Sequence, residues 1–187
     1  MEITVRPAQL TDATYAAPLI IDAIGEIANR LTGEDELQAI LTELEVLFKR
    51  TDNRHSYKNT YVAEIAGEVA GIMVVYGGDQ APTLDNNLEK WLTAKGATIQ
   101  SIEVEARTDE FYIDTICTAQ QFRGQGVGTV LLKYADIVAK EKGYHKVSLS
   151  VEKPKERARH LYEKMGFVFS EPWTIIGEEF DHMVKEV

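Results

Sequence analysis

One stretch decides the fold of this chain: Gln121-Phe122-Arg123-Gly124-Gln125-Gly126-Val127-Gly128-Thr129. A β-rich run at residues 111–118 leads into it, and an amphipathic helical pattern follows it. Its three glycines within five residues permit positive φ angles and a close backbone approach to a ligand. A helix start also presents unpaired N–H groups and the positive end of the helix dipole, which suits a phosphate. The alternative is a tight strand-to-helix turn that binds nothing.

The pattern around the glycines predicts how the C-terminal half is connected. A helix is expected at 127–142 and a strand at 145–151. Because strand 111–118 precedes that helix, the three elements form a βαβ unit with two parallel strands. A helix pattern at 158–165 follows, and one or two closing strands are expected within 167–184.

Hydrophobic periodicity also predicts the elements of the N-terminal half. In chain order they are a strand at 2–6, a helix carrying Ile20 to Leu31, a helix at 37–48, a polar loop at 50–56, a hairpin of strands 61–65 and 69–76, a short helix at 84–92 and a short strand at 99–104. A chain that combines these helices with these strands is predicted to have an α/β (α+β) fold.

Length and composition indicate one globular domain over residues 1–187. The 187 residues can bury a sizeable core, and 44% hydrophobic and 27% charged residues are ordinary values. The sequence has no run of eighteen apolar residues and no signal-peptide pattern, so a cytoplasmic protein with no membrane partner is expected. Cys117 is the single cysteine, and the four histidines lack cysteines at metal spacing, so no metal is expected.

The net charge of −10 argues against nucleic acid as the main partner, since phosphate binding needs a basic face. Acidic residues gather at 34–36, at 103–114 and at 178–181. Such clusters attract a cationic amine, although an ordinary solvated surface also explains them.

The glycine spacing separates this loop from the commonest nucleotide loops. No lysine follows Gly128, as a Walker loop requires, and the spacing differs from the Rossmann pattern. The pattern Arg123-x-x-Gly126-x-Gly128 instead resembles the glycine loop of the GNAT superfamily of acyl-CoA N-acyltransferases. Downstream, Ala158-x-x-Leu161-Tyr162-Glu163-Lys164-x-Gly166-Phe167 resembles the second signature of that family. The resemblance extends to the order of elements over nearly the whole chain.

This resemblance implies the GNAT fold, with a central, mixed and mostly antiparallel sheet and helices on both faces. The strand before the glycines would splay from its parallel neighbour. Acetyl-CoA would be the acyl donor, with its pyrophosphate on the glycine loop and its pantetheine arm in the gap. The residues that match the family's cofactor contacts are Ile116, Cys117, Thr118, Arg123, Gly124, Gln125, Gly126, Val127, Gly128, Thr129, Lys155, Ala158 and Tyr162.

The resemblance also suggests catalytic residues. GNAT members often place a tyrosine at the position of Tyr162, where its O–H can protonate the leaving thiolate. A core tyrosine is the alternative. Asp114 is the first candidate for the base and Glu110 the second, and alternation would place Asp114, Ile116 and Thr118 on one strand face. A salt-bridging role is the alternative for Asp114. The backbone N–H of Thr118 is expected to polarise the thioester carbonyl.

Lys155 departs from the family pattern, and Cys117 is a candidate nucleophile that must be weighed against a packing role. Lys155 stands where many GNAT members have a cofactor-binding asparagine, and lysine cannot accept a hydrogen bond. It would reach a phosphate or remain solvated. Cys117 has no histidine close in sequence, so packing is a better explanation for it than nucleophilic catalysis.

We therefore expect an N-acetyltransferase that moves an acetyl group from acetyl-CoA to a primary amine by direct attack in a ternary complex. The acceptor pocket would form from the first two helices, the 77–110 segment and the tail. The acidic clusters favour a small cationic acceptor, and a protein N-terminus or lysine is the alternative. An acyl-CoA sensor without turnover is an alternative of another class, since it would use the same loop. The edge strands and the tail offer a surface for a homodimer.

Overall fold

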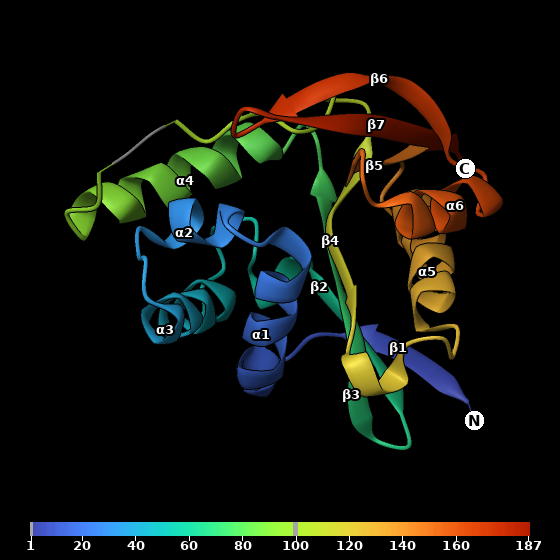
Figure 1. Ribbon diagram of the computed structural model, residues 1–187, viewed down its shortest axis with the longest axis horizontal. Helices are drawn as coiled ribbons and strands as arrows, with labels where there is room; N and C mark the ends of the chain where they lie inside the picture. Colours follow the sequence, from blue (N-terminus) through green and yellow to red (C-terminus); the bar gives the residue numbers. More distant parts are fainter. Residues whose placement is uncertain (1, 99–100) are drawn as a thin grey trace.

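The computed structural model describes residues 2–98 and 101–187, which form a seven-stranded sheet with helices on both faces (Figure 1). The strand order is β1-β2-β3-β4-β5-β7-β6, and among these described strands only β4 and β5 are parallel neighbours. The strands are β1 (Ile3–Pro7), β2 (Thr60–Ile65), β3 (Glu68–Gly77), β4 (Phe111–Thr118), β5 (Lys146–Glu152), β6 (Val168–Ile175) and β7 (Glu178–Glu186). The helices are α1 (Ala13–Ile24), α2 (Ile27–Thr32), α3 (Leu37–Lys49), α4 (Ala81–Ala94), α5 (Val127–Glu141) and α6 (Glu156–Lys164). The predicted mixed sheet is confirmed.

Two apolar clusters lie on opposite faces of the sheet. In Figure 1, α1, α2 and α3 lie on one side of β3 and β4, and α5 and α6 lie on the other. On the first side Ile20 and Leu44 pack against Ile72 of β3. On the second side Leu131 of α5 packs in a cluster with Ile113 of β4. Strand β4 is therefore buried between two layers, and the predicted βαβ unit β4-α5-β5 is present with parallel strands.

The pattern from Ile20 to Leu31 predicted one helix, and that prediction is wrong. The structure has α1 and α2, separated at Gly25, where φ is 55° and ψ is −129°. Periodicity does not reveal this break, because the apolar spacing continues across it. Within the part of the chain that the structure describes, no helix combines the length and apolar character needed to cross a membrane.

The strand predicted at 99–104 is not formed as expected. Ile99 and Gln100 lie outside the described residues, and 101–104 have no regular secondary structure. Hydrogen bonds instead join residues 101–104 to α4 and β6. The Ile102 N–H donates to Glu89 of α4 at 2.8 Å, and the ring N–H of Trp173 in β6 donates to the Val104 carbonyl at 2.9 Å.

A β-bulge in β4 changes the direction of its side chains. In the pairing with β3, Val74 lies opposite Thr115 and Val75 opposite Ile113, so Asp114 is the extra residue. Ile113 and Ile116 consequently both pack in the cluster of α5. The predicted shared face of Asp114 and Ile116 is wrong, because simple alternation does not continue through a bulge.

The parallel strands β4 and β5 pair only near their first residues. Their contacts join Phe111 to Val147, Tyr112 to Ser148 and Ile113 to Leu149. Beyond these pairs, β4 continues to pair with β3, and β5 continues to pair with β7. The facing edges of the two strands therefore separate after Ile113 and Leu149.

Candidate functional site

A cavity of about 280 Å³ occupies the gap between the separated strands. One wall is residues 114–118 of β4, and the other is residues 149–152 of β5. Ala158 and Tyr162 of α6 also line it. The cavity thus lies at the carboxyl ends of two parallel strands, a common place for ligands in sheets of this kind.

The backbone of β4 offers hydrogen-bonding groups to this cavity. The Ala119 N–H donates to the Ala70 carbonyl at 2.9 Å, which makes 70/119 a hydrogen-bonded pair of the β3–β4 ladder. In an antiparallel ladder the next pair, Gly71 and Thr118, is then a pair whose N–H and C=O groups point outward. The Thr118 carbonyl accepts from Arg123 Nε at 3.4 Å, in agreement with this direction. The outward groups of Thr118 and Ile116 therefore face the gap.

The glycine loop forms a groove that continues from this cavity. Thr118, Arg123, Lys155 and Ala158 line both the groove and the cavity. Gly124 and Gly126 have φ of 80° and 91°, which side chains with a Cβ rarely adopt.

The start of α5 lies in the same groove. The Val130 N–H donates to the Gly126 carbonyl at 3.1 Å, so the N–H groups of Val127, Gly128 and Thr129 precede the helical ladder. These unpaired donors and the helix dipole make the groove suitable for an anion.

The predicted cofactor-binding residues lie along this path, with one exception. The groove is lined by Thr118, Arg123, Gly124, Gly126, Val127, Gly128, Thr129, Lys155 and Ala158. Ile116, Cys117, Thr118 and Tyr162 line the cavity. Gln125 lines neither space, and its Nε2 donates to the Gln121 carbonyl at 3.3 Å. Lys155 forms an ion pair with Glu152 at 2.9 Å, so its charge is partly matched within the chain.

Tyr162 of α6 and Cys117 of β4 both line the cavity. Burial raises the pKa of Tyr162 to about 12, so its O–H remains protonated across the physiological range. Its ring meets Phe167 edge-on, with 6.2 Å between the centroids. Burial also raises the pKa of Cys117 to about 11, which keeps it a thiol and disfavours a nucleophilic role.

Asp114 accepts hydrogen bonds from several buried groups. Tyr76 Oη donates to it at 2.6 Å, and it forms ion pairs with Arg54 and His55, each at 3.2 Å. Burial acts to raise the pKa of Asp114, but the charges of His55 and Arg54 outweigh burial and hold that pKa below its usual range. A carboxylate so stabilised accepts a proton poorly, so the geometry favours an electrostatic anchor over the base that the sequence suggested.

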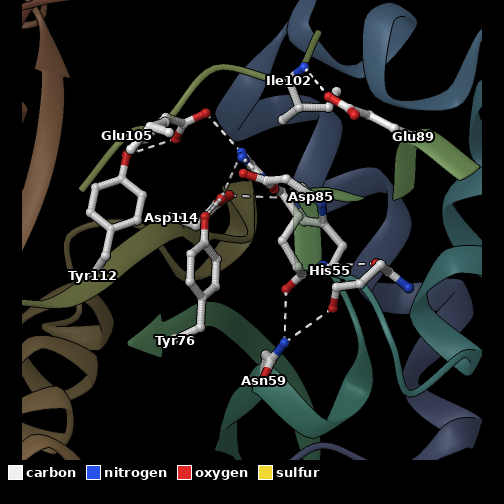
Figure 2. Close-up of polar contacts among 12 residues, drawn as sticks. His55, Asn59, Tyr76, Asp85, Glu89, Ile102, Glu105, Tyr112 and Asp114 are labelled. Carbon is white, nitrogen blue, oxygen red and sulfur yellow. Dashed lines mark hydrogen bonds and ion pairs between the residues drawn. The ribbon is translucent and has the colours of Figure 1, made fainter. Parts of the chain in front are cut away.

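Arg54 is the centre of this network, and sequence reasoning missed it. Its side chain is 2% exposed and pairs with Glu105 at 2.7 Å and Asp85 at 2.9 Å, besides Asp114. Figure 2 shows Asp85, Glu105 and Asp114 pointing toward one another, with Tyr76 and Tyr112 beside them. Three carboxylates around one guanidinium leave an excess of negative charge. The loop at 50–56 gave no signal beyond polarity, because nothing in its pattern shows which charge is buried.

Glu105 is a second residue whose position the sequence did not reveal, beyond its place in an acidic cluster. It lines the cavity, and its Oε2 accepts from Tyr112 Oη at 2.8 Å. Burial raises the pKa of Glu105 despite the charge of Arg54. Glu105 therefore presents to the cavity a carboxyl group that is protonated more readily than an exposed glutamate.

Glu110, the second candidate base, does not line the cavity. It accepts from the Arg107 N–H at 3.1 Å and lies 2.8 Å from Nε2 of the buried His182. Burial acts to raise the pKa of Glu110, but the hydrogen bond and charge of His182, together with the Ser148 hydroxyl and the Arg107 N–H, outweigh burial and lower that pKa.

The far wall of the cavity comes from some of the segments that the sequence assigned to the acceptor, but the predicted helix at 37–48 contributes no residue to the lining. Asp22, Ile24 and Ile27 approach from α1 and α2, and Ile175 and Phe180 from β6 and β7. This wall is mainly apolar, so together with the acidic network it suits a cation that carries an apolar part. Among residues 2–98 and 101–187, no group of three or more His, Cys, Asp and Glu side chains is arranged to hold a metal ion.

Comparisons with known proteins agree with this geometry. The sequence model of the Acetyltransferase (GNAT) family matches residues 21–167. A crystal structure of an acetyltransferase is 32% identical, with 98% of this chain and 99% of that chain covered and a TM-score of 0.81. An N-acetyltransferase from Staphylococcus aureus Mu50 is 23% identical, with 97% and 99% covered and a TM-score of 0.81.

A GNAT family acetyltransferase from Elizabethkingia anophelis, solved with acetyl-CoA bound, shares the fold at 19% identity, with 99% and 98% covered and a TM-score of 0.57. A search of curated proteins returns no match. The family model spans the glycine loop, the separated strands and α6, which are the elements that build the groove and the cavity. The chain therefore belongs to the GNAT family of acetyltransferases.

Proposed function

We propose that this protein transfers an acetyl group from acetyl-CoA to the primary amine of a small cationic acceptor, by direct attack in a ternary complex. The observation that carries the proposal is the continuous path from the glycine loop, past Tyr162, to a cavity bordered by Glu105 and Asp114. One end of this path suits a pyrophosphate and the other suits a cation. A reaction between the two ligands would occur where the path passes between β4 and β5.

The donor would lie along the groove and the gap. The N–H groups at the start of α5 would hold its pyrophosphate, with Arg123 adding charge-assisted contacts. The outward backbone groups of Ile116 and Thr118 would pair with the pantetheine amides, in place of the missing strand pairing. The Thr118 N–H would also stabilise the oxyanion that forms on the thioester carbonyl.

The chemical step needs two proton transfers. The free amine attacks the thioester carbonyl, and the tetrahedral intermediate loses one proton from nitrogen. When the C–S bond breaks, Tyr162 gives its proton to the leaving thiolate, and solvent restores the tyrosine. The products are the acetamide and CoA. Asp114 and Glu105 would attract the cationic acceptor, and its ammonium group would lose a proton to solvent before the free amine attacks.

Thiol release tests the proposal directly. In four separate reactions, the protein and acetyl-CoA are incubated with one of four acceptors. These are spermidine, 2-phenylethylamine, a peptide with a free N-terminus and an N-blocked lysine peptide. We expect release that depends on one of the two small amines. Release only with a peptide would favour the protein-acetylating alternative. A rise in Tm with CoA but no release from any amine would favour a sensor.

Tyr162→Phe is expected to lower kcat about 10-fold to 100-fold, because the leaving thiolate loses its proton donor. The Kd of acetyl-CoA should change less than about 3-fold, since binding depends mainly on the loop. Steady-state kinetics and calorimetry measure the two quantities, and an unchanged rate in viscous buffer first establishes that chemistry limits kcat. Tyr134→Phe on α5, outside the cavity lining, is the matched control. A wild-type kcat in Tyr162→Phe would exclude the acid role.

A further inference from the structure

Behind the cavity wall, the side chains of Ser150 on β5, His182 on β7 and Glu110, which immediately precedes β4, form a hydrogen-bonded row. The ring of His182 on β7 is fully buried, and its Nε2 lies 2.8 Å from a carboxylate oxygen of Glu110. Its Nδ1 lies 3.1 Å from Oγ of Ser150 on β5. Ser150 lines the cavity, whereas the structure places neither His182 nor Glu110 in its lining. The row therefore leads from the cavity into the protein interior.

The chemistry of Glu110 determines which ring nitrogen carries the proton. Its lowered pKa makes it an ionised carboxylate that only accepts hydrogen bonds. His182 must then carry a proton on Nε2 and donate it to Glu110. In the neutral ring Nδ1 is left with a free lone pair, which accepts from the Ser150 hydroxyl. A proton can therefore pass from the cavity to His182 through Ser150.

The surroundings hold the histidine ring in this orientation. Trp173 of β6 packs against it with 4.8 Å between centroids, and the Tyr112 ring of β4 lies 6.4 Å away at 20° to its plane. The titratable groups that face it are Glu110 just before β4, Tyr112 of β4 and Glu171, opposite it in register on β6. Glu171 is itself paired with Arg107. Glu110 is thus the carboxylate in direct contact with the ring.

Ser150 occupies a position that suits contact with the acceptor amine. It follows Leu149, the last residue of β5 that pairs with β4, so it stands where the gap begins. Ser150 lines the same cavity as Tyr162 and Glu105, and its hydroxyl lies 3.1 Å from His182 Nδ1. An amine that reacts in that cavity would have two partners, Ser150 as a proton acceptor and Tyr162 as a proton donor.

We propose that Ser150, His182 and Glu110 form a proton relay that serves as the general base of the acetyl transfer. This inference rests on the proposed function. As the tetrahedral intermediate collapses, the nitrogen gives a proton to Ser150 Oγ, and the hydroxyl proton moves to His182 Nδ1. The resulting imidazolium is stabilised by Glu110 and later loses its proton to solvent. Ser150 is the catalytic residue, and His182 and Glu110 act through it.

Kinetics of Ser150→Ala, His182→Gln and the double variant test the relay. The probe amine is spermidine or 2-phenylethylamine, whichever releases thiol faster from the wild type. Each single variant is expected to lose about 10-fold to 100-fold in kcat/KM for the amine, with the Kd of CoA unchanged. Because both act in one relay, the double variant should lose no more than either single variant. Thr174→Ala, which removes an exposed hydroxyl from β6 outside the cavity lining, should retain wild-type kinetics.

The relay can also be tested without the reaction, by measuring which ring nitrogen of His182 carries the proton. In ¹⁵N-labelled wild-type protein, His182 should be the Nε2–H tautomer, and Glu110→Gln should weaken that preference. The Nδ1–H tautomer in the wild type would overturn the relay while leaving the proposed function intact, as would wild-type kinetics in Ser150→Ala. The relay would also be overturned if the loss of kcat/KM in the double variant equalled the product of the losses in the two single variants. No thiol release by the wild type with any amine would reject the proposed function and the relay together. If His182→Gln does not fold, Ser150→Ala and the tautomer decide the question.

Discussion

Gly126→Val is expected to weaken CoA binding about 100-fold or more while the protein remains folded. Gly126 has a φ of 91° and is the N-cap of α5, and a β-branched residue there forces the loop into another conformation. The N–H groups of the loop would no longer converge on one anion. Loss of two charge-assisted hydrogen bonds at about 1.5 kcal/mol each accounts for an effect of this size. Calorimetry with CoA measures it.

The other end of the same helix provides a matched control. Gly143 follows α5 with a φ of 83°, and a Cβ there would meet no atom within 4 Å, as at Gly126. Gly143→Val should therefore cost similar backbone strain, about 1–3 kcal/mol, without changing CoA affinity. Equal CoA affinities for Gly126→Val and the wild type would refute the loop as the pyrophosphate site. A loss of affinity in both variants would attribute the effect to strain alone.

The parts of the fold that depend on local patterns could be predicted from the sequence. The glycine loop, the βαβ unit and the hairpin each arise from residues close in the chain, where spacing alone distinguishes a strand from a helix. The backbone conformation at Gly124 and Gly126 could be predicted for the same reason, because tolerance of a positive φ depends on the single residue. These are also the elements on which the proposed acetyl-CoA site rests.

The acceptor side depends on contacts between distant residues, and it was predicted poorly. Arg54 meets Asp85, Glu105 and Asp114, which are 31, 51 and 60 positions away. A polar loop gives no signal for such a partner. The bulge at Asp114 is likewise set by pairing with β3, so alternation along β4 alone gave the wrong face. The candidate base was therefore chosen without the charges that surround it.

Arg54→Met is expected to destabilise the protein by about 3–5 kcal/mol at pH 7, measured as the free energy of unfolding in urea. The substitution keeps an apolar stem of similar length but removes the only guanidinium found among Asp85, Glu105 and Asp114 in the described residues. Uncompensated charge in a buried site is costly because it has lost both water and its partner. Arg50→Met is the matched control in the same loop. Arg50 pairs with Asp52 at the surface, with side chains 40% and 39% exposed, so its loss should cost less than about 1 kcal/mol.

The pH dependence of this deficit has a definite sign. In the wild type the pKa of Asp114 is lowered below its unfolded value, so its contribution is present above the unfolded pKa and is lost as the pH falls. In Arg54→Met, burial without the cation raises the folded pKa values of Asp85 and Glu105 further, so these groups take up protons on folding and stability is regained on acidification. The difference in unfolding free energy between the two proteins should therefore shrink as the pH falls from 7 toward 4. Adding Asp85→Asn to Arg54→Met should restore part of the lost stability at pH 7, since one uncompensated charge is removed. A deficit that grows on acidification, or no recovery with Asp85→Asn, would show that Arg54 stabilises the fold through packing of its stem and not through its charge.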